Sequence, residues 1–249
     1  MSWVLLRGLT RESRHWGDLP QQLAAAGDAV ITLDLPGNGV FCGLRSPASV
    51  RAMTLFAREQ LQRQGLRPPW RVLAMSLGGM VATDWAQQFS GELAALVLVN
   101  TSMRPFSRPT ERLRPGNAPA LMRLAVNWGD ACQAEEIVHR LTCRRHDTRD
   151  DDLAAWTAIR RSAPVAAGNA WRQLWAAARF AAAPAAPACP VLLLSSAADG
   201  LVDPRCSQAL ARAWQAPHRV HPWAGHDLPH DDAAWVCRQL AGWPTPPRP

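Results

Sequence analysis

Apolar runs of strand length recur along the chain, and the segments between them repeat their apolar positions with the period of a helix. Uninterrupted apolar runs are typical of strands that are buried on both faces of a parallel sheet. We expect six strands, at residues 3–6, 30–33, 71–75, 93–99, 191–195 and 219–221. Helices are expected at residues 15–26, 49–64, 77–88, 204–215 and 231–242. The pattern predicts an α/β protein with helices on both faces of its sheet.

Residues 101–187 interrupt this alternation with helical and loop sequence and no convincing strand. Helices are expected there at residues 119–127, 134–141, 150–161 and 165–182, with Trp156, Trp171, Leu174 and Trp175 as apolar anchors; packing is the expected role of the tryptophans, and contact with a ligand is the alternative. We therefore expect a core of residues 1–100 and 188–243, a helical insertion of residues 101–187, and a disordered tail at 244–249.

Composition excludes several classes of function. The formal charge is +7, but all 27 basic residues are arginines, and they are spread along the chain. A general bias toward arginine explains this charge better than a nucleic-acid-binding surface, which would gather the basic residues in one patch. The six cysteines show no C-x-x-C spacing and no neighbouring histidine cluster, so neither a zinc site nor a disulfide framework is predicted, and no cofactor motif is present.

Neither the apolar run at the N-terminus nor the alanine-rich stretch has the pattern of a signal or membrane-spanning segment. The N-terminal apolar run lacks the length and cleavage site of a signal peptide, and the alanine-rich residues 174–194 are interrupted by Arg179 and three prolines. We expect a cytoplasmic protein without a membrane partner.

The segment Ala74-Met75-Ser76-Leu77-Gly78 links an expected strand to an expected helix through a tight turn at Ser76. Small residues two positions before and after the serine allow a sharp turn that exposes its hydroxyl group. This arrangement predicts a nucleophile, although a serine at this place can also serve only as a helix cap.

Two further polar residues follow the last two expected strands. Asp199 comes at the end of the fifth, and His226 lies in the loop after the sixth, so both are expected at the sheet edge that holds Ser76. A serine needs an imidazole to accept its proton and a carboxylate to orient that imidazole. Asp203 and Asp227 are competing carboxylates, but Asp203 has the position of a helix cap and Asp227 directly adjoins the histidine.

The first expected strand ends in Arg7-Gly8-Leu9. A glycine here allows the chain to turn over the strand end, where the amide of Leu9 and the amide of Leu77 would together hold a developing oxyanion. An ordinary glycine turn is the alternative.

These motifs resemble those of the α/β-hydrolase fold over nearly the whole chain. The segment around Ser76 resembles the nucleophile elbow, residues 34–39 resemble the Asp-x-Pro-Gly-x-Gly loop, and Asp199 and Gly225-His226 resemble the acid and histidine loops. The resemblance implies a trimmed six-stranded sheet with residues 101–187 as a helical lid. Arg7 departs from the His-Gly that begins the oxyanion loop of many relatives, and Asp227 departs from their aromatic residue after the histidine.

The resemblance implies a serine hydrolase that cleaves a carboxylic ester or thioester through an acyl-enzyme on Ser76. The motifs are similar to those of esterases that act on pimeloyl carrier-protein methyl esters. Carbon–carbon bond hydrolysis, acyl transfer with the same triad, and a non-enzymatic ligand-binding role remain as alternatives. The expected lid carries 13 arginines against eight acidic residues, which suggests either a solvated surface or a docking face for an acidic carrier protein.

Overall fold

The computed structural model describes residues 2–244, which form a six-stranded parallel sheet in the order β2-β1-β3-β4-β5-β6. The strands are β1 (Ser2–Leu6), β2 (Ala29–Leu33), β3 (Trp70–Met75), β4 (Leu93–Val99), β5 (Val191–Ser196) and β6 (His218–His221). The six strands expected from the sequence are all present, and their ends differ from expectation by at most one residue. The chain thus has the six-stranded α/β fold that the apolar runs predict.

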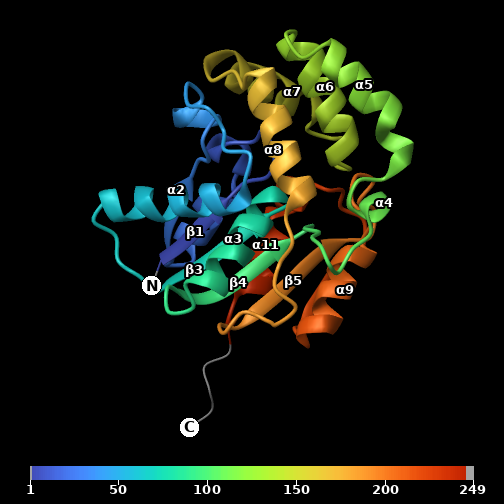
Figure 1. The fold of residues 1–249 in the computed structure, drawn as a ribbon. Helices are drawn as coiled ribbons and strands as arrows, with labels where there is room; N and C mark the ends of the chain where they lie inside the picture. Colours follow the sequence, from blue (N-terminus) through green and yellow to red (C-terminus); the bar gives the residue numbers. More distant parts are fainter. Residues whose placement is uncertain (1, 245–249) are drawn as a thin grey trace.

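Alternate residues of the central strands belong to two separate cores, one on each face of the sheet. In β1, Val4 and Leu6 pack with α2 and α3, whereas Trp3 and Leu5 pack with α1 and α11. The period-two alternation of side chains explains why strands that are apolar throughout need helices on both faces, as Figure 1 shows. The covering helices are α1 (Leu19–Ala25), α2 (Val50–Arg63), α3 (Leu77–Gln88), α9 (Arg205–Trp214) and α11 (Ala233–Leu240).

Two helices expected to be continuous are each divided. The first is a 3-10 helix, η1 (Ser13–Trp16), followed by α1, because Gly17 adopts a left-handed φ of 57° between them. The last is a short α10 (Leu228–Asp231) followed by α11, which starts where the Asp232 side chain accepts a hydrogen bond of 2.7 Å from the Trp235 amide. Local caps decide both boundaries.

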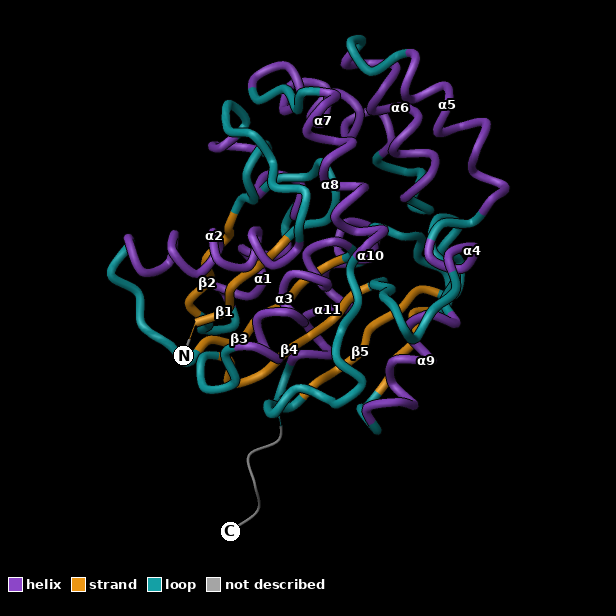
Figure 2. The backbone as a smooth tube through the Cα atoms, in the orientation of Figure 1, coloured by secondary structure: helices purple, strands orange, loops and turns teal. Residues whose placement is uncertain are grey.

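The segment between β4 and β5 is helical and lies over the carboxyl edge of the sheet (Figure 2). Its helices are α4 (Pro109–Arg112), η3 (Pro115–Asn117), α5 (Ala118–Val126), α6 (Ala131–Thr142), α7 (Arg149–Ser162) and α8 (Ala167–Arg179). We call α4 to α8 the insertion helices. The short α4 and η3 were not expected, because one turn of helix leaves no periodic pattern in the sequence.

The expected packing role of the insertion's apolar side chains is wrong for three of four residues. Trp156 is buried, but Trp171, Leu174 and Trp175 are 64%, 38% and 56% exposed. All three lie on α8, and Trp171 and Leu174 border a cavity between this helix and the sheet edge instead of packing into a core.

Residues 245–249 of the expected disordered tail lie outside the described residues. Within residues 2–244, no helix combines the length and apolar character needed to cross a bilayer.

A buried ion pair fastens the loop after β1 to the loop after β6. The two guanidinium nitrogens of Arg7 donate to the two carboxylate oxygens of Asp227 at 2.9 and 2.5 Å, and the two side chains are 2% and 3% exposed. Burial alone would raise the pKa of the Asp227 carboxyl, but the adjacent Arg7 charge and its hydrogen bonds lower that pKa to about 2. Arg7 and Asp227, which both depart from the family pattern, are thus bound to each other.

Removing one member of this pair should destabilise the fold far more than removing both. We expect Arg7→Met to lower the free energy of unfolding by about 3–5 kcal/mol, because it leaves a buried carboxylate uncompensated. The double variant Arg7→Met/Asp227→Leu should recover most of this loss, since it buries no charge. Urea unfolding measures both, and a double variant as unstable as the single one would contradict this account of the pair.

Candidate active site

Ser76 occupies the turn between β3 and α3 with an unusual backbone conformation. Its φ is 52° and its ψ is −118°, a conformation that costs a non-glycine residue about 1–3 kcal/mol. Neighbouring groups hold it there: the Ser76 amide donates to the Val99 carbonyl at 3.0 Å, and the Thr101 hydroxyl donates to the Ser76 carbonyl at 2.7 Å. The side chain is half-buried and borders a cavity.

Glycines after Ser76 allow α3 to approach the end of β1 closely. A Cβ atom at Gly78 would lie 2.5 Å from the carbonyl oxygens of Leu6 and Arg7, and one at Gly79 would lie 2.7 Å from the Thr101 hydroxyl. Neither position has space for a side chain. Ala74, the small residue two positions before the serine, is fully buried in the core.

Asp199 and His226 lie together at the carboxyl edge of the sheet, although 27 residues separate them in sequence. His226 Nδ1 is 2.7 Å from Asp199 Oδ2, and both residues are buried. The other carboxylate oxygen, Oδ1, accepts the amides of Leu201 and Val202 at 2.8 and 2.9 Å. These two hydrogen bonds fix the carboxylate and leave Oδ2 for the imidazole.

Burial and neighbouring charges change the pKa of His226 in opposite directions. Burial lowers the pKa of its imidazole, but the charge of Asp199 and its hydrogen bond, together with the charge of Asp227, raise that pKa above the ordinary 6.5. The imidazolium is therefore favoured in this environment, as a general base that becomes protonated requires.

The two competing aspartates have other partners. Asp203 Oδ1 accepts the Arg205 amide at 2.9 Å at the start of α9, and Oδ2 lies 2.7 Å from the Arg205 guanidinium. Asp227 is bound to Arg7. The structure thus places Asp199, rather than either competitor, in contact with the His226 ring.

Two residues that sequence reasoning missed position the histidine loop. The side-chain amide of Asn100 donates to the carbonyl oxygens of His226 and Gly225 at 2.7 and 3.2 Å, and the Asp231 carboxylate accepts the Gly225 amide at 2.7 Å. Asn100 follows β4 directly. Its position as a polar residue directly after a central strand could have identified it in the sequence.

The loop after β1 lies against Ser76. A Cβ atom at Gly8 would be 3.1 Å from Ser76 Cβ and 3.6 Å from Ser76 Oγ, so a side chain here would crowd the serine. Leu9, Leu77 and Ser76 border the same cavity. Among the loop and cap hydrogen bonds of residues 2–244, none uses the amide of Leu9 or Leu77 as donor.

The cavity beside Ser76 has a volume of about 710 Å³ and lies between the sheet edge and the insertion helices. Its walls are mainly apolar and come from α3, α5, α8 and the loop after β5; they include Met80, Leu121, Leu124, Trp128, Trp171, Leu174, Leu201 and Val202. Arg104 and Arg112 are its charged lining residues. A cavity of this size and lining suits the apolar part of a small molecule.

A family model described as serine aminopeptidase, S33 (Hydrolase_4) matches residues 2–232 of the chain. The chain is also 30% identical over 237 residues to a pimeloyl-[acyl-carrier protein] methyl ester esterase of Aromatoleum aromaticum, covering 95% of this chain and 84% of that protein. These similarities extend over the sheet, the insertion helices and all the site residues described above.

Solved structures share the fold at lower identity. A thermophilic esterase of Thermogutta terrifontis is 23% identical with a TM-score of 0.75, over 98% of this chain and 89% of that one. An esterase of Exiguobacterium antarcticum is 15% identical with a TM-score of 0.77, over 98% of this chain and 91% of that one. With the family match across the sheet and the site, the chain belongs to the serine aminopeptidase S33 (Hydrolase_4) family of α/β hydrolases, which has esterases among its relatives.

Proposed function

We propose that the protein is a serine hydrolase that cleaves a carboxylic ester or thioester, with Ser76 as nucleophile, His226 as general base and Asp199 as the acid that orients it. The contact of 2.7 Å between the buried Asp199 and His226 carries the proposal. It is supported by the strained turn that exposes Ser76 at this edge.

The proposed reaction begins when Ser76 Oγ attacks the acyl carbon and His226 Nε2 takes the hydroxyl proton. The Asp199 carboxylate accepts a hydrogen bond from Nδ1–H and leaves the proton on the ring, so it keeps the Nε2 lone pair available and stabilises the imidazolium. The imidazolium then protonates the departing alcohol or thiol, which leaves an acyl group on Ser76. Water, deprotonated by His226, then attacks the acyl carbon; the bond from that carbon to Ser76 Oγ breaks, the imidazolium returns its proton to Oγ, and the carboxylic acid is released.

We assign the oxyanion hole to the backbone amides of Leu9 and Leu77. Both residues border the cavity with Ser76, and neither amide is used in the loop and cap hydrogen bonds of residues 2–244. The Arg7–Asp227 pair would hold the Leu9 loop against the histidine loop, in place of the residues that many relatives use. Preorganised donors of this kind stabilise the charge that develops on the acyl oxygen.

We further propose that residues 101–187 act as the lid and that the acyl chain occupies the apolar cavity beneath it. The insertion helices supply Leu121, Leu124 and Trp171 to the lining, so they would decide which acyl chains fit. The volume of about 710 Å³ suits acyl chains of medium length rather than acetyl groups alone.

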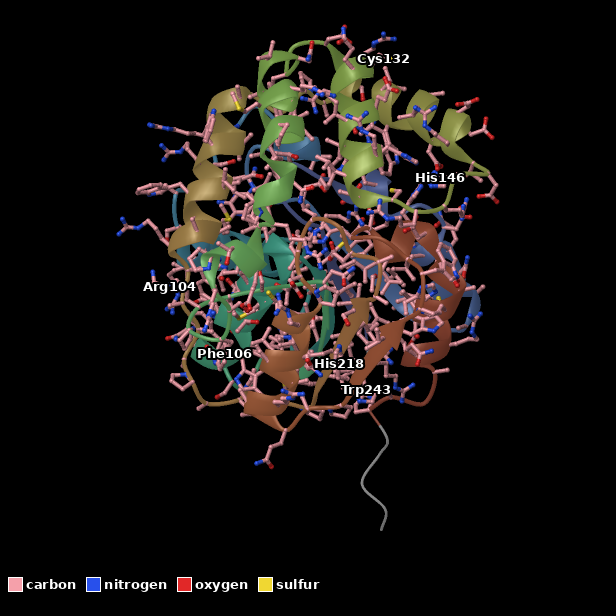
Figure 3. The ribbon with its side chains drawn as sticks, turned by 90° about the vertical axis from the view of Figure 1, so that its right-hand side faces the viewer. Arg104, Phe106, Cys132, His146, His218 and Trp243 are labelled. Atoms are coloured by element: carbon pink, nitrogen blue, oxygen red, sulfur yellow. The ribbon has the colours of Figure 1, made fainter. Side chains whose placement is uncertain are left out.

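An acidic carrier protein is the partner that we propose for this lid. The relative of Aromatoleum aromaticum acts, by its name, on an ester of an acyl-carrier protein. Arg160 is unsuited to docking, because it is bound to the buried Glu135. Arg104 and Arg179 are better suited: both are exposed, Arg104 borders the cavity, and Arg179 lies over the Trp175 ring. Figure 3 shows Arg104 pointing outward from the molecule.

Substitution of the three proposed residues tests the mechanism. Ser76→Ala and His226→Ala should each lower kcat/KM for a p-nitrophenyl ester by several orders of magnitude, and Asp199→Asn should also be severe. The matched control Asp203→Asn should keep its activity and lose about 1 kcal/mol of stability, because it weakens only a helix start. Substantial turnover by Ser76→Ala, or a larger loss in Asp203→Asn than in Asp199→Asn, would contradict the assignment.

The pH dependence of kcat/KM tests His226 as the base. Its imidazole must be neutral to accept a proton, and its pKa is raised above 6.5, so activity should fall as the pH drops, with a midpoint above 6.5. Below that midpoint we expect about a tenfold loss per pH unit. A profile that stays flat to acid pH would exclude His226 as base; Asp203→Asn, with an unchanged midpoint, is the control.

The salt dependence of turnover tests the carrier partner. Attraction between exposed charges is largely screened beyond about 8 Å at physiological ionic strength, so kcat/KM for a carrier-linked ester should fall with added salt. A free methyl ester should show no such fall. Arg104→Gln/Arg179→Gln should weaken the salt dependence, whereas Arg63→Gln on α2, where the arginine pairs with Glu59, should not. Equal salt slopes for both substrates would remove the carrier from the proposal and leave the triad untouched.

A further inference from the structure

A second group of chemically reactive side chains lies outside the proposed active site, between the insertion helices and the histidine loop. It consists of His139 on α6, Cys143 at the end of that helix, and His230 on α10. One ring nitrogen of each histidine and the Cys143 sulfur all lie within 4.8 Å of one another. Two imidazoles and a thiol are the donors that zinc prefers in proteins.

A fourth donor faces both imidazoles. Asp152 Oδ2, on α7, lies 3.4 Å from His139 Nε2 and 3.0 Å from His230 Nε2. Donor atoms about 2.0–2.1 Å from a tetrahedral zinc ion are about 3.3 Å from one another, so these two separations already match a zinc site. The two ring nitrogens and the Cys143 sulfur lie up to 4.8 Å apart, so each pair would need to approach by about 1.5 Å at most to bind one ion.

One of these donor atoms is buried without a hydrogen-bond partner among the described residues. His230 Nε2 is buried, and among residues 2–244 it has no partner in hydrogen-bond geometry, although the Asp152 oxygen is near. A buried nitrogen without a hydrogen-bond partner is a group that a bound cation would satisfy.

We propose that His139, Cys143, His230 and Asp152 bind one zinc ion. On binding, the Cys143 thiol loses its proton to solvent, and the thiolate and the Asp152 carboxylate together balance the two positive charges of the ion. Four protein ligands make a closed site, which is structural rather than catalytic.

The site would join parts of the chain that are distant in sequence. His139, Cys143 and Asp152 belong to the insertion, whereas His230 follows His226 by four residues. The same contact region already includes the hydrogen bonds of the Asp227 amide to the Thr142 carbonyl and of the Arg144 amide to Asp231. The ion would therefore hold α6 and α7 against the loop that carries the proposed base.

Zinc titration of the untagged, chelator-treated protein tests the site. We expect one ion per chain, a higher thermal unfolding temperature with zinc, and a fall in zinc affinity on the order of 100-fold in Cys143→Ser and in His230→Gln, since even outer-shell losses cost about 10–100-fold. Cys132→Ser and His146→Gln are matched controls on the same insertion, where both side chains are exposed (Figure 3). They should bind zinc as the wild type does.

Cobalt substitution tests the same site without any variant. Co²⁺ bound to the wild-type chain should give the intense visible bands of a tetrahedral ion and a thiolate-to-cobalt charge-transfer band in the near ultraviolet. Absence of stoichiometric zinc binding, binding that Cys143→Ser and His230→Gln leave unchanged, or a cobalt spectrum without the thiolate band would each overturn the proposal. The four side chains would then be a polar packing cluster.

Discussion

The backbone of Ser76, held at a φ of 52°, is the constraint on which the rest of the site depends. This conformation points a serine out of a sharp strand-to-helix turn, and it persists only where the surroundings enforce it. Here β4 binds its amide, Thr101 binds its carbonyl, and α3 approaches β1 so closely that Gly78 cannot carry a Cβ atom. The central strands and the helix packed on them thus position the proposed nucleophile.

The loops around this turn are held by buried polar contacts rather than by further strands. Arg7 and Asp227 join the loops after β1 and β6, and Asn100 binds the carbonyls of the histidine loop. These contacts bring the proposed oxyanion donors and the proposed base to one edge of the six-stranded sheet. Each of these two buried side chains neutralises the charge of the other, which is why a change at one position alone would be costly.

Much of the fold could be predicted from the sequence, because strands buried on both faces leave uninterrupted apolar runs. All six strands were predicted in this way. Helix boundaries were predicted less well: Gly17 and Asp232 divide helices whose apolar period continues across the break. The exposure of Trp171 was missed because periodicity identifies an apolar face but not what, if anything, packs against it.

The residues of the candidate site were predictable where a local motif marks them, as around Ser76 and His226. The contact of Asp199 with His226 was inferred only from chain order and the sheet edge. The pairing of Arg7 with Asp227 was not predicted, since 220 residues separate them and neither has a partner nearby in sequence. The same holds for His230, which reaches His139 and Cys143 only after the chain has folded.

Covalent trapping tests whether Ser76 is the nucleophile. The protein is treated with a fluorophosphonate, and the adduct is located by peptide mass spectrometry, with His226→Ala and Ser76→Ala treated in parallel. The account predicts one adduct per chain on Ser76, much slower labelling of His226→Ala, and none at that site in Ser76→Ala. A wild-type protein that hydrolyses esters but carries its adduct on another residue, or carries none, would contradict it.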